Sequence, residues 1–258
     1  MEQIEKSLTF HHHSIELPGG ELTRPDTPLL ADSGKMQSVK RILDFIFANR
    51  NARAVNVIDL GCLEGGTTAE FARWGYEVLG LEARESNLKR CRYVAERLRL
   101  PNLRFVKDNM LNVEAYGEFD VVYASGVLYH VADPEAFLNI LGKVTKTVLV
   151  LNTHYATDPP PAKFEARLSE MTQHKGRRGQ WFSEWPETLN VKQIEKRRKS
   201  AYDTHRAFWL AKEELLDAMQ KAGFPLIFEQ FDQLKNIKEG YVRRLGFARG
   251  SFVGLKMR

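Results

Sequence analysis

The chain has 258 residues, of which 43% are hydrophobic and 28% charged, with a formal net charge of +5. This composition is that of a folded chain with a sizeable core, and it excludes a disordered or low-complexity protein. No apolar run approaches the roughly 20 residues of a membrane helix, and the N-terminus lacks the apolar stretch of a secretory signal, so we expect a cytoplasmic protein without a membrane partner.

Turn signals dominate the N-terminal part of the chain. A Pro-Gly-Gly triplet at 18–20 and two further prolines predict that residues 1–34 form an extended arm outside any main sheet. Apolar residues then recur at helical spacing, which predicts an amphipathic helix over residues 35–49.

From residue 55, short apolar runs alternate with helical stretches. The predicted strands cover 55–60, 77–82, 103–107, 119–124 and 147–152. The predicted helices cover 67–74, about 86–100 with Ser86 as its N-cap, and 134–144 with proline at its first position. This alternation is typical of a parallel sheet with helices on both faces.

The rhythm breaks after residue 155. Residues 156–206 contain three consecutive prolines and no clean periodicity, so we interpret them as an inserted lid or substrate element in a core formed by 35–155 and 207–258. Within the last part, a helix over 212–222 and strands over 225–231 and 251–256 are expected, the two strands forming an antiparallel hairpin at the sheet edge through a short loop.

Positive charge is concentrated in the insert. From Lys163 to Arg206 there are 11 Lys and Arg against 6 Asp and Glu. This segment could bind an anionic substrate, with Arg177 and Arg178 as candidates, or it could be a solvated surface. Four aromatic residues in or beside it could stack on a sugar or base, or pack the insert on the sheet: Trp181, Trp185, Phe208 and Trp209.

A glycine-rich turn follows the first strand. The run Asp59-Leu60-Gly61-Cys62 is followed by Gly65, and the spacing differs from the G-x-G-x-x-G dinucleotide fingerprint. Glycines at such a turn allow a tight bend and a close approach of a ligand to the backbone. Glu82 ends the next predicted strand, where an acid can accept both hydroxyls of a ribose.

These residues resemble motif I of the class I methyltransferases that use S-adenosylmethionine (SAM), with Leu63 in place of the usual middle glycine. The resemblance covers about residues 55–150. It implies a Rossmann-like α/β fold, an open and mostly parallel seven-stranded sheet, and SAM as the cofactor. The cofactor-binding residues that it implies are Asp59, Gly61, Cys62, Gly65, Glu82, Ala83, Asp108, Asn109, Met110 and Ser125.

Two histidines follow the predicted fourth and fifth strands. In several branches of the family a histidine at the place of His130 lies near the transferred methyl group, and a neutral imidazole there could take a proton from a hydroxyl acceptor. His130 could instead order its loop. His154 could also reach the cleft, although a structural role is the stronger interpretation.

No metal site is expected. Adjacent side chains of an extended chain point to opposite faces, so His11, His12 and His13 are poorly placed to share one ion. Cys62 and Cys91 belong to no Cys-x-x-Cys pair.

The segment 13–20 is similar to one that precedes the SAM domain in a group that includes tRNA wobble-uridine carboxymethyl-transferring enzymes. Three functions follow as hypotheses. The first is O-methylation of a small hydroxylated metabolite or sugar. The second is modification of tRNA, and the third is SAM binding without catalysis.

Overall fold

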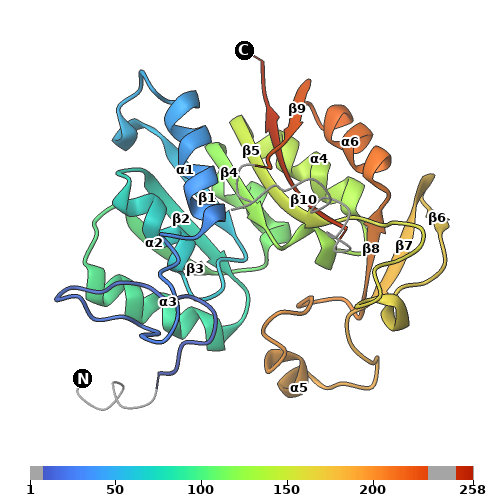
Figure 1. Cartoon of the computed structure of the whole chain (residues 1–258), viewed down its shortest axis with the longest axis horizontal. Helices are drawn as coiled ribbons and strands as arrows, with labels where there is room; N and C mark the ends of the chain where they lie inside the picture. Colours follow the sequence, from blue (N-terminus) through green and yellow to red (C-terminus); the bar gives the residue numbers. More distant parts are fainter. Residues whose placement is uncertain (1–7, 232–247, 258) are drawn as a thin grey trace.

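A seven-stranded sheet runs through the centre of the computed structural model, which describes residues 8–231 and 248–257 (Figure 1). Across the sheet the strands are β3 (Leu103–Lys107), β2 (Glu77–Glu82), β1 (Asn56–Leu60), β4 (Phe119–Ser125), β5 (Thr145–His154), β10 (Arg249–Leu255) and β9 (Leu226–Glu229). Of these strands, only β10 runs in the opposite direction to the others, because it pairs antiparallel with both β5 and β9. The predicted fold class and the edge hairpin are confirmed, and the loop joining the hairpin lies outside the described residues.

Alternate residues of the central strands face the two layers of helices. Val57 packs among helices α1 (Gly34–Ile46), α2 (Gly66–Arg73) and α3 (Glu85–Leu98). The next residue, Ile58, belongs to the core on the other face, with side chains of helices α4 (Pro134–Val144) and α6 (Lys212–Lys221). Helices therefore cover both faces, as the strand–helix alternation predicts.

The insert has regular structure of its own. Strands β6 (Thr172–His174), β7 (Arg177–Ser183) and β8 (Arg206–Leu210) form an antiparallel sheet. Helix α5 (Val191–Glu195) falls between β7 and β8 in the sequence. Because β8 pairs with β7, this small sheet extends to residue 210, beyond the predicted boundary at 206. Its strands are short and mix charged with aromatic residues, which hides their alternation in the sequence.

Two local predictions were wrong. Helix α3 begins at Glu85 with Arg84 at the N-cap position, so Ser86 is inside the helix, where its backbone N–H donates to the Glu195 carboxylate at 3.0 Å. Strand β5 continues to His154, beyond the predicted end at 152, because Thr153 and His154 pair with the start of β10.

A close helix contact on the second face depends on one glycine. A Cβ built on Gly142 of α4 would lie 2.0 Å from the carbonyl oxygen of Ala222, the residue that caps α6. This is far inside van der Waals contact, and the obstacle is backbone, which cannot rotate away. Any side chain at position 142 therefore separates the two helices.

We expect Gly142→Ala to lower the free energy of unfolding by about 1–3 kcal/mol, because forcing extra volume into a packed contact costs this much even though alanine favours helices. Urea unfolding followed by circular dichroism measures the change. Asn139→Ala, at an exposed position of the same helix, is the matched control and should be neutral or stabilising. Equal stability of Gly142→Ala and the natural chain would contradict the close contact.

Candidate active site

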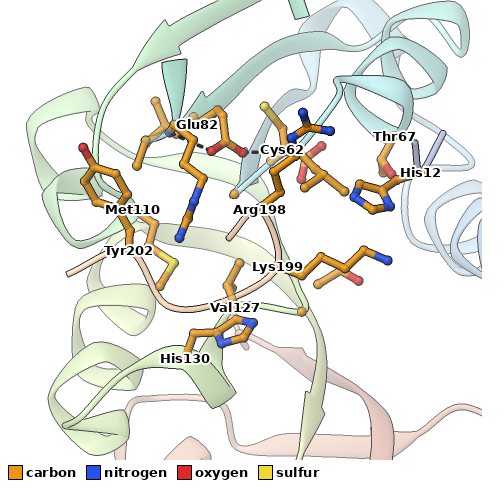
Figure 2. A pocket seen from close by; sticks show the side chains of 18 of the residues that line it. His12, Cys62, Thr67, Glu82, Met110, Val127, His130, Arg198, Lys199 and Tyr202 are labelled. Atoms are coloured by element: carbon orange, nitrogen blue, oxygen red, sulfur yellow. Dashed lines mark hydrogen bonds between the residues drawn. The ribbon is translucent and has the colours of Figure 1, made fainter. Parts of the chain in front are cut away.

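A cavity of about 440 Å³ lies where the carboxyl ends of β1, β2 and β4 meet. Open α/β sheets bind their ligands at this edge. The insert contributes residues 198–203 to the lining, so it also borders the cavity. In Figure 2, Glu82 and His130 lie at opposite ends of the pocket, with Arg198 and Lys199 between them.

The turn after β1 has the backbone that its glycine pattern predicts. Gly61 has a φ of +65°, and a Cβ there would lie 2.7 Å from a methyl carbon of Val127. Leu63, in the place of the usual glycine, also adopts a positive φ of 58°, a strained conformation for a residue with a side chain. The carbonyl oxygen of Leu63 accepts a hydrogen bond from the thiol of Cys91, 3.2 Å away, which helps to hold this conformation.

Glu82 is buried and its carboxylate is held by two backbone groups. The N–H of Leu63 donates to one oxygen at 2.9 Å, and the N–H of Arg84 donates to the other at 2.8 Å. Burial raises the pKa of this carboxyl, although both N–H groups oppose the shift. Its position on the pocket wall leaves acceptor capacity for hydroxyl donors of a ligand.

Asp59 lies beneath the glycine turn and is fully buried. The hydroxyl of Thr68 donates to its carboxylate at 2.7 Å, and Lys35 is the nearest favourable charge. Burial raises the pKa of Asp59 to about 7, and neither partner cancels this effect. The carboxyl is thus partly protonated near neutral pH.

The residues after β3 form a turn at the pocket wall. The carboxylate of Asp108 accepts hydrogen bonds from the Tyr116 hydroxyl and the Asn112 amide, both at 2.7 Å, and the Tyr116 bond lowers its pKa. Asn109 donates to the Asp203 carboxylate of the insert at 2.8 Å. Met110 also lines the pocket.

His130 sits at the other end, after β4, and pairs with a carboxylate from the insert. Its Nδ1 lies 2.6 Å from the Glu184 carboxylate, which is buried just beyond β7. The second Glu184 oxygen accepts the N–H of Ala201 at 3.1 Å. With Nδ1 engaged by an acceptor, the neutral ring carries its proton there and leaves Nε2 as a base.

Arg84 fastens the insert over the end of the pocket where Glu82 lies. Its guanidinium donates to the carbonyl oxygens of Ser200 and Ala201, both at 3.0 Å, and lies over the ring of Tyr202. The segment 198–203 is therefore held against the wall formed by Glu82 rather than projecting into solvent.

The N-terminal arm completes the pocket in a way that the sequence did not reveal. The backbone N–H groups of His11, His12 and His13 all donate to the buried carboxylate of Glu64, at 2.8–2.9 Å. The Nδ1 of His13 accepts the N–H of Gly66, 3.0 Å away, at the start of α2. Burial lowers the pKa of His12 and of His13 to about 4, so both rings are neutral.

Not every predicted residue lies in the pocket. Gly65 is the N-cap of α2, behind the wall, and His154 stacks on the indole of Trp209 with 4.8 Å between ring centroids; neither lines the cavity. Arg177 was wrongly assigned to acceptor binding, because its guanidinium pairs with Glu135, Glu214 and Asp217 on the α4–α6 side.

The aromatic residues of the insert pack within it and against the core of the central sheet. Phe208 and Trp209 are buried, and the Trp209 indole N–H donates to the carbonyl oxygen of Tyr129 at 2.9 Å. Trp185 donates to the carbonyl oxygen of Ala201 at 3.2 Å, while Trp181 packs on Phe208. None of the four lines the described pocket.

A sheet in this strand order, with a glycine turn after β1 and an acid ending β2, defines an α/β protein that binds a nucleoside-containing cofactor. Residues 51–222 match the model of the methyltransferase domain family. The chain belongs to this family, which confirms the class predicted from the glycine turn.

Curated relatives are ubiquinone biosynthesis O-methyltransferases. The protein of Nitrobacter winogradskyi is 30% identical over 161 residues, covering 53% of this chain and 61% of its own length. That of Caulobacter vibrioides is 34% identical over 93 residues, covering 36% and 37%. The chain thus spans between about one third and three fifths of the length of these relatives.

Solved structures share the fold. The N-terminal domain of EvdMO1, with S-adenosylhomocysteine (SAH) bound, superposes with a TM-score of 0.63 at 24% identity, covering 88% of this chain and 82% of the other. Magnesium protoporphyrin IX methyltransferase from Synechocystis, also with SAH, gives 0.51 at 17% identity, covering 87% and 84%. No helix in the described part of the chain is long and apolar enough to cross a membrane.

Asp59 should make stability depend on pH. Its folded pKa of about 7 exceeds the unfolded value near 3.8, so the folded state binds more protons between these values and loses stability as pH rises through them. Asp59→Asn should escape this loss and keep the Thr68 hydrogen bond. We expect its stability relative to the natural chain to improve by about 1–3 kcal/mol from pH 5 to pH 8.

Urea unfolding of both ligand-free proteins at the two pH values measures this change. The comparison between the variants cancels the titration of all other groups. A stability difference that does not change between pH 5 and pH 8 would mean that the Asp59 carboxyl ionises as it does in water.

Proposed function

We propose that the chain is a SAM-dependent enzyme that O-methylates a small hydroxylated metabolite or sugar. One observation carries the proposal: a single cavity holds the acid of β2 at one end and an imidazole oriented by a carboxylate at the other. The first suits a cofactor ribose, and the second suits removal of a hydroxyl proton.

The pocket residues fit SAM by their chemistry. Glu82 would accept the ribose hydroxyls, and Met110 with Tyr202 would border the adenine. Gly61 lines the pocket with its backbone alone, so the methionine part can approach the turn closely. Solved structures of the same fold contain SAH, which supports SAM as the cofactor.

The cofactor supplies a methyl group made electrophilic by its sulfonium. The residues of the chain then align an acceptor hydroxyl with that methyl group and remove its proton. Nε2 of His130 takes the proton as the oxygen gains the methyl group. The imidazolium that results is stabilised by Glu184, 2.6 Å from Nδ1.

Closure of the insert favours a small acceptor. The segment 198–203 lies across the cavity and is fastened through Arg84 and through the bond between Asn109 and Asp203. A run of four cations at 196–199 beside the opening keeps a tRNA substrate as the second candidate, because cations there could contact phosphates.

Incubation with methyl-labelled SAM tests the proposal, with total RNA and a small-metabolite extract offered in separate reactions. We expect label in the metabolite reaction. Label only in RNA would establish the tRNA alternative. Label in neither, together with tight SAM binding, would establish a binding protein without catalysis.

The assignment of Glu82 predicts a specific loss. Glu82→Gln should weaken SAM affinity by about 10- to 100-fold, corresponding to the roughly 1.5–3 kcal/mol of hydrogen bonds to a charged group. Titration calorimetry measures this. Glu77→Gln, at the exposed start of the same strand, controls for the change of charge and should bind as the natural chain does. Unchanged affinity of a folded Glu82→Gln would refute the ribose assignment.

Substitution of His130 or of its partner Glu184 should lower the turnover number. His130→Ala should lower kcat by about 10²–10⁴-fold with SAM affinity unchanged.

Glu184→Gln should lower kcat by about 10-fold or more with little change in the KM for SAM, because it leaves the ring without a charged partner. Glu187→Gln, an exposed acid of the insert, is the control. A Glu184 variant that loses SAM binding and kcat equally would show that the residue only supports the insert.

A further inference from the structure

One corner of the pocket carries positive charge that the proposed reaction does not use. It lies at the end of β4, around Ser125 and Gly126. The Lys35 ammonium donates to the Ser125 hydroxyl at 3.2 Å. On the other side, a Cβ built on Gly126 would lie 3.6 Å from the Arg249 Nη2 and 3.2 Å from the Tyr129 hydroxyl oxygen. Two cations thus lie at this corner, Lys35 at Ser125 and Arg249 beside the space that Gly126 leaves unfilled.

Arg249 is held in place by uncharged groups. It begins β10 opposite His154, so it lies at the carboxyl end of β5. Its Nε donates to the side-chain oxygen of buried Asn152 at 2.7 Å, and the guanidinium lies 5.4 Å from the centre of the Tyr129 ring. The residue as a whole is exposed to solvent, yet these contacts orient it and leave its Nη groups at the pocket.

The carboxylates of the pocket are engaged elsewhere. Asp59 accepts from Thr68, Glu82 from two backbone N–H groups, Asp108 from Tyr116 and Asn112, and Asp203 from Asn109. Within residues 8–231 and 248–257, neither Lys35 nor Arg249 makes an ion pair. The corner therefore has cationic donors that form no ion pair with a carboxylate of the described chain, although the charge of Lys35 also acts on Asp59.

The corner adjoins the proposed base. The ring of Tyr129 lies 4.3 Å from that of His130, centre to centre, and 5.4 Å from the Arg249 guanidinium carbon. The imidazole and the guanidinium are therefore within about 10 Å of each other, and both are close to the ring of Tyr129. A molecule of the size of a single substituted ring can reach both.

We propose that the methyl acceptor is an acid, a hydroxylated molecule whose carboxylate or phosphate binds Arg249 with support from Lys35 while its hydroxyl lies at His130. The inference rests on the proposed function and adds the charge of the substrate. A guanidinium held by its Nε presents its Nη donors to two oxygens of one planar or tetrahedral anion. Arg249 is then the residue that selects acidic acceptors.

The test separates acceptors by charge. A small-metabolite extract is divided by anion exchange into a retained acidic fraction and an unretained fraction, and each is incubated with methyl-labelled SAM and enzyme. We expect the natural chain to label the retained fraction, and the labelled product to bind the column again because its acid group stays free. Arg249→Gln should lower this labelling about tenfold or more.

Control measurements distinguish a loss of acceptor binding from a loss of cofactor binding. SAH affinity of Arg249→Gln, measured by calorimetry, should stay within about twofold of the natural chain, since Arg249 is assigned to the acceptor. Arg104→Gln removes one cation from an exposed position of β3 outside the pocket and should label normally. Matching thermal unfolding of both variants excludes misfolding.

Three results would overturn the proposal while leaving methyl transfer intact. They are label confined to the unretained fraction, equal labelling by Arg249→Gln, and a loss of SAH affinity in that variant that accounts for its lost labelling. Absence of label from both fractions with the natural chain would refute the proposed function itself, and the acidic acceptor with it.

Discussion

The buried carboxylate of Glu82 organises the pocket through two backbone N–H groups. One comes from Leu63 in the turn after β1, and the other from Arg84 at the N-cap of α3. The carboxylate thereby fixes the end of β2 to the turn after β1 and to the start of α3. Arg84 in turn binds the backbone of Ser200 and Ala201, so the same short stretch also determines where the insert lies. Glu82 and Arg84 together thus connect the turn after β1, the end of β2 and the insert. The buried carboxylate is satisfied by uncharged N–H donors.

A second buried acid plays a similar part for the N-terminal arm. Glu64 gathers the N–H groups of three consecutive residues, 11–13, which is the kind of satisfaction that a buried carboxylate requires. The arm then places the His13 ring against the first N–H of α2. Neutral His13 replaces the capping side chain that Gly65 cannot provide.

Local patterns predicted the sheet and the residues at its strand ends. Val57 and Ile58 face opposite cores because they follow one another in a strand, and strand order places Asp59, Glu82 and Asp108 at one edge. The partners contributed by distant segments could not be read from spacing. Glu184 is one acid among several in a charged insert, and only the fold of β7 and β8 brings it to His130. The prediction that Arg177 binds the acceptor failed for the same reason, because acids of α4 and α6 neutralise its charge.

The position of β10 inside the sheet has a consequence for how the chain folds. Among the described strands β9 pairs only with β10, although β9 precedes it in the sequence. Until residues 249–255 have been synthesised and have left the ribosome, β9 lacks its partner β10 and the edge of β5 that pairs with β10 is unpaired. Strands β1 to β5 and their helices can assemble earlier, because their pairings need no later segment. The pairing of β10 with both β5 and β9 is therefore a non-local event that follows the synthesis of the other strands, and until it occurs β5 presents an unpaired edge to other chains.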